Sequence, residues 1–580
     1  MNGRGDVVRA EIVRNALTAA AVEMSKTLVR TAHNPLLYDV QDFGLGIVSA
    51  EGLLWAEAPG ITTFLGSLPD TIKGGLAIHG EEGFSDGDVV IVNDPYLTGT
   101  HISDVCVYMP VFHGDELVAF AAACAHWADV GGKTPGGFAP DSTDVFQEGL
   151  RLGHQKLIHA GRPNRELWEV IEANVRFPSL VIGDLEAQIA ACRQGVERVR
   201  ALCRKYGVAA VREAMDLTVR RTEEAIRRQI AGIPDGTYRA RAQLDPDPLS
   251  GERPTIALTF EVLGDRIRVS FEGTSPAVRS PINEPAIGAR ADLRAALKGL
   301  LMPTDPSNEG HFLPFEFDLP PGLIVSPEPP APCDSYGYVG VALMDLTFAA
   351  LAPAMPDRCP AGGYQLFAIY LYRVDPGLGR PFVFIEPIDG GDGARPFADG
   401  PTLVFLGDGD VRCTPVEVLE ARYPLRCLRY EFLPGVAGPG RFRGGLGVRR
   451  DFEVLEEGTY LQVVIDSTDE PLARGLAGGG DGRPSAVVVR PGTAGEQVLR
   501  RRVSGFGPLG PGDVVSVRSG GGGGWGPASA RDPELVAQDV RDGFLTAEEA
   551  RSIYRVAVVR SDGSWDVDRG ATDRLRSADG

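Results

Sequence analysis

Residues 99–132, GTHISDVCVYMPVFHGDELVAFAAACAHWADVGG, contain the pattern His-x-x-Asp-Val twice, once from His101 and once from His126. The whole chain has only eight histidines, and two of them are used in this repetition. The residues between the two copies decide whether the fold brings them together.

These intervening residues predict a β-hairpin. Residues 105–112 are mostly β-branched or aromatic, residues 117–124 are apolar, and Gly114 and Asp115 lie between the two runs. Glycine accepts the positive φ that a tight turn requires, so the Gly-Asp pair marks the turn. Pro110 cannot donate a ladder hydrogen bond, so we expect an edge position or a bulge there.

The hairpin would bring both motifs to one end. A turn at Gly114 and Asp115 places His101 within about two positions of His126 across the strands, where opposed neighbours lie roughly 5 Å apart and diagonal ones roughly 7–8 Å. A strand sends residues i and i+3 to opposite faces, so each His-x-x-Asp must stand where its strand ends or bends. The two motifs therefore form one candidate site.

Imidazole and carboxylate ligands indicate a divalent metal. This ligand set suits Zn, Mn or Fe, and the absence of thiolate leaves room for an open, catalytic position. The alternative is that the same side chains make ordinary structural hydrogen bonds. Neighbouring polar residues favour the metal; they are Asn93, Asp94, Thr100 and Glu148.

Composition limits the class of protein. A chain of 580 residues is long enough for two to four domains. The net charge of −20 argues against nucleic-acid and anionic-membrane partners, and no apolar run is long enough to span a membrane. The eight cysteines are scattered and the N-terminus lacks a signal-peptide pattern, so we expect a cytoplasmic protein.

The order of elements predicts an α+β, multi-domain fold, because strands and helices segregate along the chain. A helix is expected from Asp6 to about Thr31, a helical block is expected to break near Tyr206, and one helical patch is expected at residues 288–303. Residues 38–156 read as short strands and turns. The expected regions are 1–160 with the metal site, 161–235 as the helical block, 236–530 rich in β-strands, and 531–580 as a helical hairpin and tail.

Short motifs of other known site types are incomplete, absent or better explained in another way. Residues 131–134, GGKT, lack the earlier glycine of a phosphate-binding loop, because Trp127 stands at that position. The glycine run at residues 519–526 could cradle an anion, but a flexible or tightly turned linker is the favoured interpretation. The chain also lacks the serine-hydrolase elbow and the His-Glu-x-x-His zinc motif.

Ordered blocks across residues 6–556 resemble the hydantoinase B/5-oxoprolinase family. They include NDPYLTGTHISDV, AHWADVGGKTPGGFAPDSTDVFQEGLR, NVRFPSLVIGDLEAQIAA, DSYGYVGVALMDLTFAALAPAMPDR and GGGGWGPASARDPELVAQDV. The resemblance implies a hetero-oligomer in which ATP is held by a separate A-type subunit that phosphorylates a small-molecule substrate. The B-type subunit then hydrolyses or carboxylates the activated intermediate at a metal site.

The resemblance also implies the site residues. The family's metal ligands fall on Asp42, His101, Asp104 and His126 of this chain. Independently of the resemblance, Asp129 and Glu148 are expected to act catalytically by orienting the imidazoles or relaying protons, the alternative being surface or turn carboxylates.

Three departures bear on the reaction. Trp127 replaces a second histidine of hydantoinase-type members, Gly44 replaces a serine, and residues 59–70 look more like the ketone carboxylase branch. An apolar Trp127 beside the metal would exclude a lytic water, unless it merely fills space in the hairpin. The expected function is an ATP-dependent amidohydrolase subunit; the alternatives are a ketone carboxylase subunit and a non-catalytic metal-binding scaffold for the A-type subunit.

Overall fold

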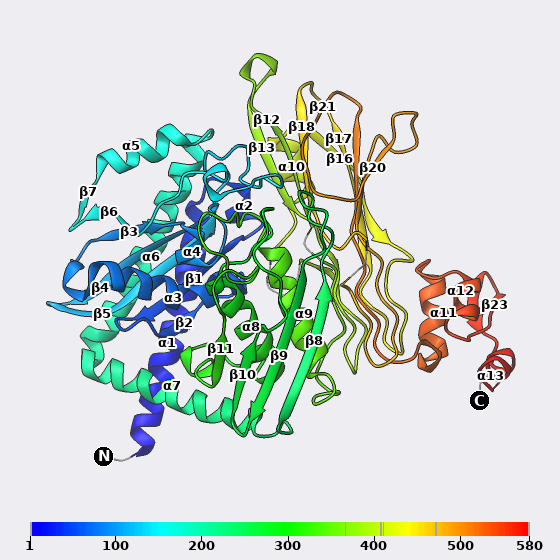
Figure 1. The fold of residues 1–580 in the computed structure, drawn as a ribbon, viewed down its shortest axis with the longest axis horizontal. Coiled ribbons are helices and arrows are strands. Elements are labelled where there is room, and N and C mark those ends of the chain that lie inside the picture. The colour runs from blue at the N-terminus through cyan, green and yellow to red at the C-terminus, as the bar shows by residue number, and fades with distance from the viewer. Residues whose placement is uncertain (1–2, 366, 406–408, 410, 470–471, 578–580) are drawn as a thin grey trace.

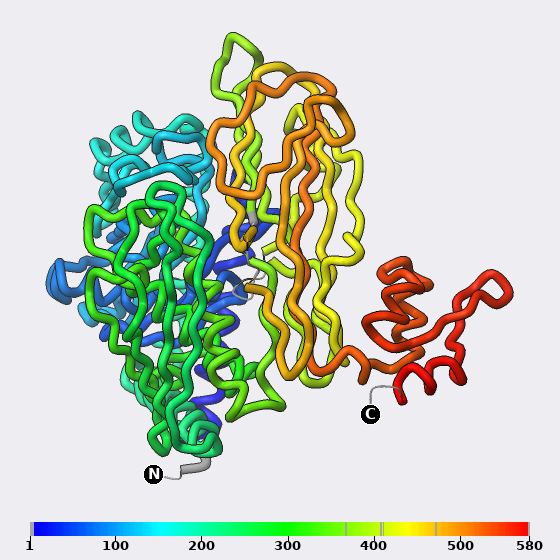
Figure 2. Tube along the Cα trace, turned by 45° about the vertical axis from the view of Figure 1, so that its right-hand side comes forward, coloured from blue at the N-terminus to red at the C-terminus, as the bar shows by residue number. Residues whose placement is uncertain are grey.

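The computed structural model describes residues 3–577 except 366, 406–408, 410, 470 and 471 (Figure 1). The N-terminal part, drawn in blue and cyan, lies beside the β-rich second half. The C-terminal segment, drawn in red, forms a small unit set apart from both (Figure 2). Helices and sheets segregate as predicted, and the mixed α+β, multi-domain class is confirmed.

A seven-stranded antiparallel sheet carries the two histidine motifs. Its order is β2-β1-β5-β4-β3-β6-β7. Helices α1 (Gly3–Thr31) and α6 (Pro178–Tyr206) cover one face of this sheet, and α3 (Thr62–His79) covers the other. The strands are β1 (Phe43–Ser49), β2 (Leu54–Glu57), β3 (Val89–Val92), β4 (Asp104–His113), β5 (Glu116–His126), β6 (Gln155–His159) and β7 (Arg162–Pro163).

The predicted hairpin is confirmed as β4–β5. Phe112 pairs with Leu117 next to the turn, and a register shift between Val111 and Phe112 then carries the ladder to the pair Asp104↔His126. Pro110 lies beside this bulge and beyond the last β4 residue that pairs with β3, Tyr108. Its missing N–H therefore leaves no position of the β3–β4 ladder empty.

The helices of the first half follow the predicted pattern. Helix α1 spans Gly3–Thr31, and the predicted break falls at Gly207, between α6 (Pro178–Tyr206) and α7 (Val208–Ile230). The short helices are α2 (Pro35–Tyr38), α4 (Pro95–Thr98) and α5 (Arg165–Asn174), with 3-10 turns at Glu81–Gly83 and Val145–Gln147.

Two buried helices correct the sequence prediction. Helix α3 (Thr62–His79) lies where only strands and turns were expected, and α9 (Gly337–Leu351) adds a second long helix after α8 (Ala286–Leu301), which is the expected patch. Most residues of α9 are buried, and α3 contains Pro69 within its length. A helix buried on almost all sides, as α9 is, lacks the one-sided apolar stripe that sequence patterns reveal, and a proline such as Pro69 of α3 predicts the end of a helix.

The second half adds further sheets. Helices α8 and α9 fill the space between α3 and the sheet β11-β10-β9-β8. One hydrophobic cluster combines side chains from residues 36–124 and 226–472, and the division into the four expected regions stays a prediction. The strands of the sheet are β8 (Gly236–Gln243), β9 (Thr255–Leu263), β10 (Arg266–Ser270) and β11 (Phe315–Asp318).

Two further sheets follow, in the orders β13-β12-β18-β21 and β16-β17-β22-β19-β20. Their strands are β12 (Phe367–Arg373), β13 (Phe382–Pro387), β16 (Leu425–Leu433), β17 (Gly447–Val454), β18 (Thr459–Ile465), β19 (Ala486–Val489), β20 (Gln497–Leu499), β21 (Val503–Leu509) and β22 (Val514–Arg518). The remaining elements are 3-10 turns at Glu309–His311, Pro376–Leu378 and Ala528–Ala530, the pairs β14 (Gly390–Gly391) with β15 (Thr402–Val404) and β23 (Val558–Ser561) with β24 (Ser564–Val567), and helices α10 (Val416–Arg422), α11 (Pro533–Arg541), α12 (Ala547–Ser552) and α13 (Arg569–Ser577).

The glycine run is a packed backbone segment, which corrects its interpretation as a flexible or tightly turned linker. Residues 519–524 are buried. A Cβ on Gly522 would lie 1.9 Å from the carbonyl oxygen of Asp392, so only glycine permits this approach. Within the part of the chain that is described, no helix has the length and apolar character needed to cross a membrane.

Candidate metal centre

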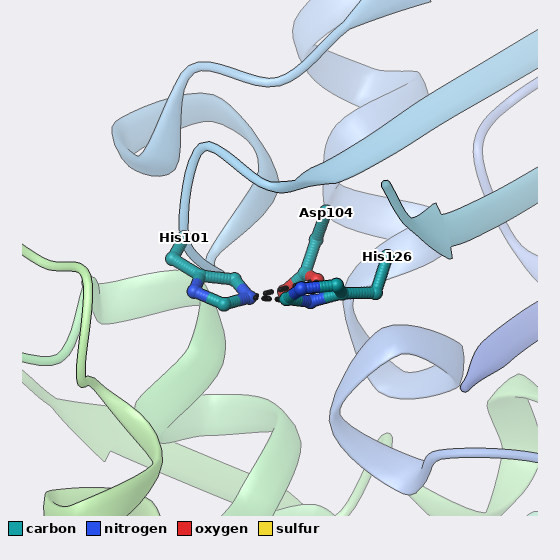
Figure 3. Close-up of side chains that lie close together, drawn as sticks. All are labelled: His101, Asp104 and His126. Atoms are coloured by element: carbon teal, nitrogen blue, oxygen red, sulfur yellow. Dashed lines mark hydrogen bonds and ion pairs between the residues drawn. The ribbon is translucent and has the colours of Figure 1, made fainter. Parts of the chain in front are cut away.

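Three predicted ligands converge at the open end of the β4–β5 hairpin (Figure 3). The Nε2 atom of His101 lies 2.9 Å from Oδ1 of Asp104 and 3.0 Å from Nδ1 of His126. That Nδ1 atom lies 3.1 Å from the same carboxylate oxygen. All three side chains are buried, and they form the one cluster of His, Cys, Asp and Glu among the described residues whose spacing could hold an ion.

Local structure explains the convergence. Asp104 is the first residue of β4 and His126 the last of β5, and the ladder pairs them directly. His101 lies in the turn that precedes β4, where the amide of Asp104 donates a hydrogen bond to the His101 carbonyl. Each His-x-x-Asp motif therefore stands at a strand end, as the faces of a strand require.

The spacing of the three donor atoms fits a metal ion. Two ligands at right angles on an ion with bonds of about 2.1 Å lie about 3.0 Å apart, which matches the observed spacings. A set of two histidines and one carboxylate on one side of an ion leaves the opposite positions open. We call His101, Asp104 and His126 the triad.

The backbone of Asp334 fixes the orientation of His101. Nδ1 of His101 lies 2.9 Å from the Asp334 carbonyl oxygen, to which only a protonated Nδ1 can donate. In a neutral imidazole with Nδ1 protonated, Nε2 carries no hydrogen, and its lone pair then faces the oxygen of Asp104. Two lone pairs repel each other unless a cation or a proton lies between them, so ordinary hydrogen bonds between neutral imidazoles do not account for the cluster.

Charge within the triad is strongly coupled. Burial would raise the pKa of Asp104, but His101 and His126 together hold that pKa at about 2. Burial would lower the pKa of His101, and the Asp104 carboxylate raises it well above its ordinary value. A carboxylate ionised at neutral pH is the form that binds a cation.

Asp42, the fourth predicted ligand, lines the same cavity as the triad. Its carbonyl oxygen accepts a hydrogen bond of 3.2 Å from the His126 amide, immediately before β1. Burial raises the pKa of its carboxyl to about 6, opposed by His126. Coordination by Asp42 stays a prediction.

The cavity beside the triad has a volume of about 80 Å³ and mostly apolar walls. The ring of Phe138 lies 4.8 Å from that of His101 and 5.2 Å from that of Tyr370. The Tyr336 hydroxyl lies 3.4 Å from Oδ2 of Asp104 and adds a polar group. The remaining lining residues are Leu36, Ile61, Phe64, Gly337, Ala368, Ile385, Pro387 and Phe405.

Trp127 does not line this cavity, which corrects the expected apolar wall. Its Nε1 donates a 2.8 Å hydrogen bond to Oε1 of Gln188 on α6, on the opposite face of the sheet. The Gln188 amide also donates to the carbonyls of Val105 and Ala123. Trp127 therefore fills space in the packing of the hairpin, which was the alternative interpretation.

Glu148 bonds the backbone segment that contacts His101. Its carboxyl accepts hydrogen bonds from the amides of Cys333 and Asp334 and from the Ser142 hydroxyl. It therefore holds the segment whose carbonyl orients His101. Burial, with a smaller effect of the Asp334 charge, raises the Glu148 pKa to about 8.

Asp129 lies outside the cavity and is bonded to Arg176. Its carboxylate accepts hydrogen bonds from the amide of Arg176 at 2.5 Å and from the guanidinium of Arg176 at 2.8 Å, and it does not line the cavity. Burial raises its pKa, opposed by Arg176. Asp129 joins the loop after β5 to the start of α6, and its catalytic role stays a prediction.

Sequence reasoning missed Asp334 and Phe138 as site residues. Asp334 lies 233 positions from His101, and its only sequence signal was membership of a block resembling the family. Phe138 lies in a long loop that has no periodic pattern.

Comparison with known proteins identifies the family. The hydantoinase B/oxoprolinase family model matches residues 6–528. The chain belongs to this family. The putative B-type subunit of a D-/L-hydantoinase from a Pseudomonas species is 31% identical, and the match covers 98% of each chain.

Two solved structures share the fold of this family member. The ATP-dependent caprolactamase of Pseudomonas jessenii superposes with a TM-score of 0.91 at 28% identity, covering 98% of this chain and 99% of that one. Nucleotide-free acetone carboxylase superposes with a TM-score of 0.90 at 19% identity, covering 98% of this chain and 82% of that one. At 19% identity the likeness to acetone carboxylase is one of fold.

Proposed function

We propose that this chain is the metal-bearing catalytic subunit of an ATP-dependent amidohydrolase that opens a cyclic amide. An A-type partner would bind ATP and activate the substrate by phosphorylation. The observation that carries the proposal is the convergence of three buried ligand atoms at a cavity. The names of two relatives, one from a hydantoinase and one from a caprolactamase, support the same reaction class.

In the proposed reaction, different side chains of the site have different roles. A divalent ion held by the triad, with Asp42 as a further ligand, would polarise the substrate oxygen that gains charge and lower the pKa of a water. Asp334 and Glu148 keep Nε2 of His101 directed at the cavity. Phe138 and Tyr370 shield the cavity from bulk water and contact the hydrocarbon part of a substrate.

Metal analysis tests the proposal. Protein purified without chelator should contain about one Zn, Mn or Fe per chain, and the His101→Ala/His126→Ala variant should contain almost none. The matched control is His113→Ala/His159→Ala, which removes two histidines that lie outside the cavity. Unchanged metal content in the first variant would refute the assignment. Full turnover by a folded, metal-free variant would instead support the scaffold alternative.

A ketone carboxylase is the second candidate, because acetone carboxylase shares the fold and the apolar cavity walls are also compatible with a ketone. The complex reconstituted with an A-type subunit and ATP should be offered caprolactam, hydantoin and 5-oxoproline, and separately ketones with labelled bicarbonate. Ring opening without label uptake is expected. Label fixed in an acid-stable product would overturn the amidohydrolase proposal.

A further inference from the structure

Tyr370, on β12, brings a hydroxyl-bearing side chain to the wall of the cavity beside the triad. It pairs with Ile385 of β13, and Ala368, two residues earlier on β12, pairs with Pro387. Residues two apart on a strand, and residues directly opposed on neighbouring strands, share one face of a sheet. All four of these side chains line the cavity, so this face of the sheet is one of its walls.

The loop after β5 packs against the Tyr370 ring. The ring of Phe138, in this loop, lies 5.2 Å from that of Tyr370 and 4.8 Å from that of His101. A Cβ on Gly136, whose φ is +88°, would lie 2.6 Å from Cδ1 of Tyr370, so only glycine lets the loop backbone pass this closely. The Tyr370 ring is therefore held in place, with one aromatic ring between it and His101.

The hydroxyl of Tyr370 makes no hydrogen bond with any residue that the structure describes, although the side chain is only 1% exposed. Other buried tyrosines are bonded. The Tyr108 hydroxyl lies 3.0 Å from Nδ1 of His154, and the Tyr338 hydroxyl accepts a 2.9 Å hydrogen bond from the Asp245 amide. Buried polar groups are nearly always satisfied, and a phenylalanine at position 370 would fill the same space without an unsatisfied group. The hydroxyl thus points to a partner that enters the cavity.

This hydroxyl is a hydrogen-bond donor at neutral pH. Burial, and after it the charges of Asp334, Asp42 and Asp104, raise the pKa of Tyr370 well above its ordinary value. Asp42 and Asp104 line the same cavity, so the hydroxyl and the triad act on one space. A protonated phenol offers its O–H to an acceptor atom of whatever occupies that space.

We propose that Tyr370 is a catalytic residue whose hydroxyl donates a hydrogen bond to the ring nitrogen of the cyclic amide. In a planar amide the nitrogen lone pair is delocalised into the carbonyl group, so the nitrogen is a poor acceptor. Once water has added to the carbonyl carbon, the lone pair is localised on nitrogen, and the hydrogen bond forms on the way to ring opening and not in the bound substrate.

The atoms balance without net consumption of Tyr370. The hydroxyl part of the attacking water bonds to the carbonyl carbon, the C–N bond breaks, and its electron pair stays on nitrogen. The nitrogen takes the remaining proton of that water, and Tyr370 keeps its own. This inference rests on the proposed function for the identity of the substrate.

The Tyr370→Phe variant removes only the hydroxyl, and it is tested in the complex reconstituted with an A-type subunit and ATP. The kcat for caprolactam should fall roughly 100-fold, the scale of one lost transition-state donor, with KM almost unchanged. Metal content and the free energy of unfolding should stay at the wild-type values. The matched control is Tyr372→Phe, which should keep the wild-type kcat, because Tyr372 lies two residues along the same strand, is 7% exposed and does not line the cavity.

The possible results separate this inference from the proposed function. Ring opening by Tyr370→Phe at the wild-type kcat would overturn the inference and leave the proposed function standing. A rise in KM at unchanged kcat would show a contact with the planar amide, and loss of metal or of stability would show a structural hydroxyl; either result would also overturn it. Label fixation in place of ring opening by the wild-type complex, or no reaction with any of the substrates offered, would overturn the proposed function and this inference together.

Discussion

Replacement of Trp127 by phenylalanine distinguishes a packing residue from a wall of the active site. The Trp127 side chain is 2% exposed, and its Nε1 satisfies Oε1 of Gln188. Phenylalanine keeps an aromatic ring but removes this donor. Because Trp127 faces α6 and not the cavity beside the triad, which we call the metal cavity, we expect a loss of stability with little change in KM or substrate choice.

The magnitude follows from two contributions. An acceptor left unsatisfied in the interior costs about 1–3 kcal/mol, here at Oε1 of Gln188. The smaller ring leaves a space that costs about 1 kcal/mol more. The Trp127→Phe variant should therefore lower the free energy of unfolding by about 2–4 kcal/mol.

Urea unfolding followed by circular dichroism measures this loss, and turnover of the reconstituted complex measures function. The matched control is Trp168→Phe on α5, because the buried Nε1 of Trp168 has no hydrogen-bond partner in the described structure. That variant should change stability by less than about 1 kcal/mol. Unchanged stability of Trp127→Phe, accompanied by a shift in substrate preference, would refute the packing assignment.

Other predictions concern carboxyl groups and buried histidines. Asp129→Asn should lower the free energy of unfolding by about 1–3 kcal/mol with metal content unchanged; lost turnover at full stability would instead support proton relay. Glu148→Gln should retain metal, whereas Glu148→Ala should weaken metal affinity about 10- to 100-fold by releasing Asp334, as measured by competition with a chelator; equal affinities would show that Glu148 does not position His101. Burial lowers the pKa of His154 and of His311 to about 4, below the ordinary 6.5, so both are neutral in the folded chain at neutral pH. The free energy of unfolding should therefore fall as pH drops from about 6.5 to about 4, by on the order of 3 kcal/mol per histidine. Substitution of both histidines by glutamine should make the free energy of unfolding depend less on pH over this range, as measured by urea unfolding at several pH values.

The hairpin and the convergence of His101, Asp104 and His126 were predictable because they depend on local rules. The turn at Gly114 and the alternation of strand faces are set by residues within one short segment, and together they bring His101 to His126. The same alternation places Trp127 on the face opposite His126. The prediction of an apolar wall at Trp127 was wrong because neighbouring residues of an extended chain face opposite sides, so Trp127 and His126 cannot line the same cavity.

The rest of the site depends on contacts between distant segments. Asp334 contacts His101 from the segment before α9, and Glu148 accepts a hydrogen bond from the amide of the same residue. Helix α9 is buried on almost all sides and shows no polar face, and α3 contains Pro69, which predicts the end of a helix, so sequence patterns did not reveal either helix. The walls of the metal cavity come partly from these helices and from β12 and β13, which no local pattern connects to the hairpin.

The arrangement of polar and apolar groups in the metal cavity bears on the reaction. Apolar walls alone do not discriminate, because they suit the methylene chain of a lactam as well as the hydrocarbon part of a ketone. The polar groups gather on one side, where the triad is joined by Asp42 and the Tyr336 hydroxyl. Hydrolysis requires a water held beside the carbonyl carbon, and this side offers both acceptors and a donor to hold one. In the proposed amidohydrolase reaction, these polar groups would hold the attacking water, and the apolar walls would contact the hydrocarbon part of the cyclic amide.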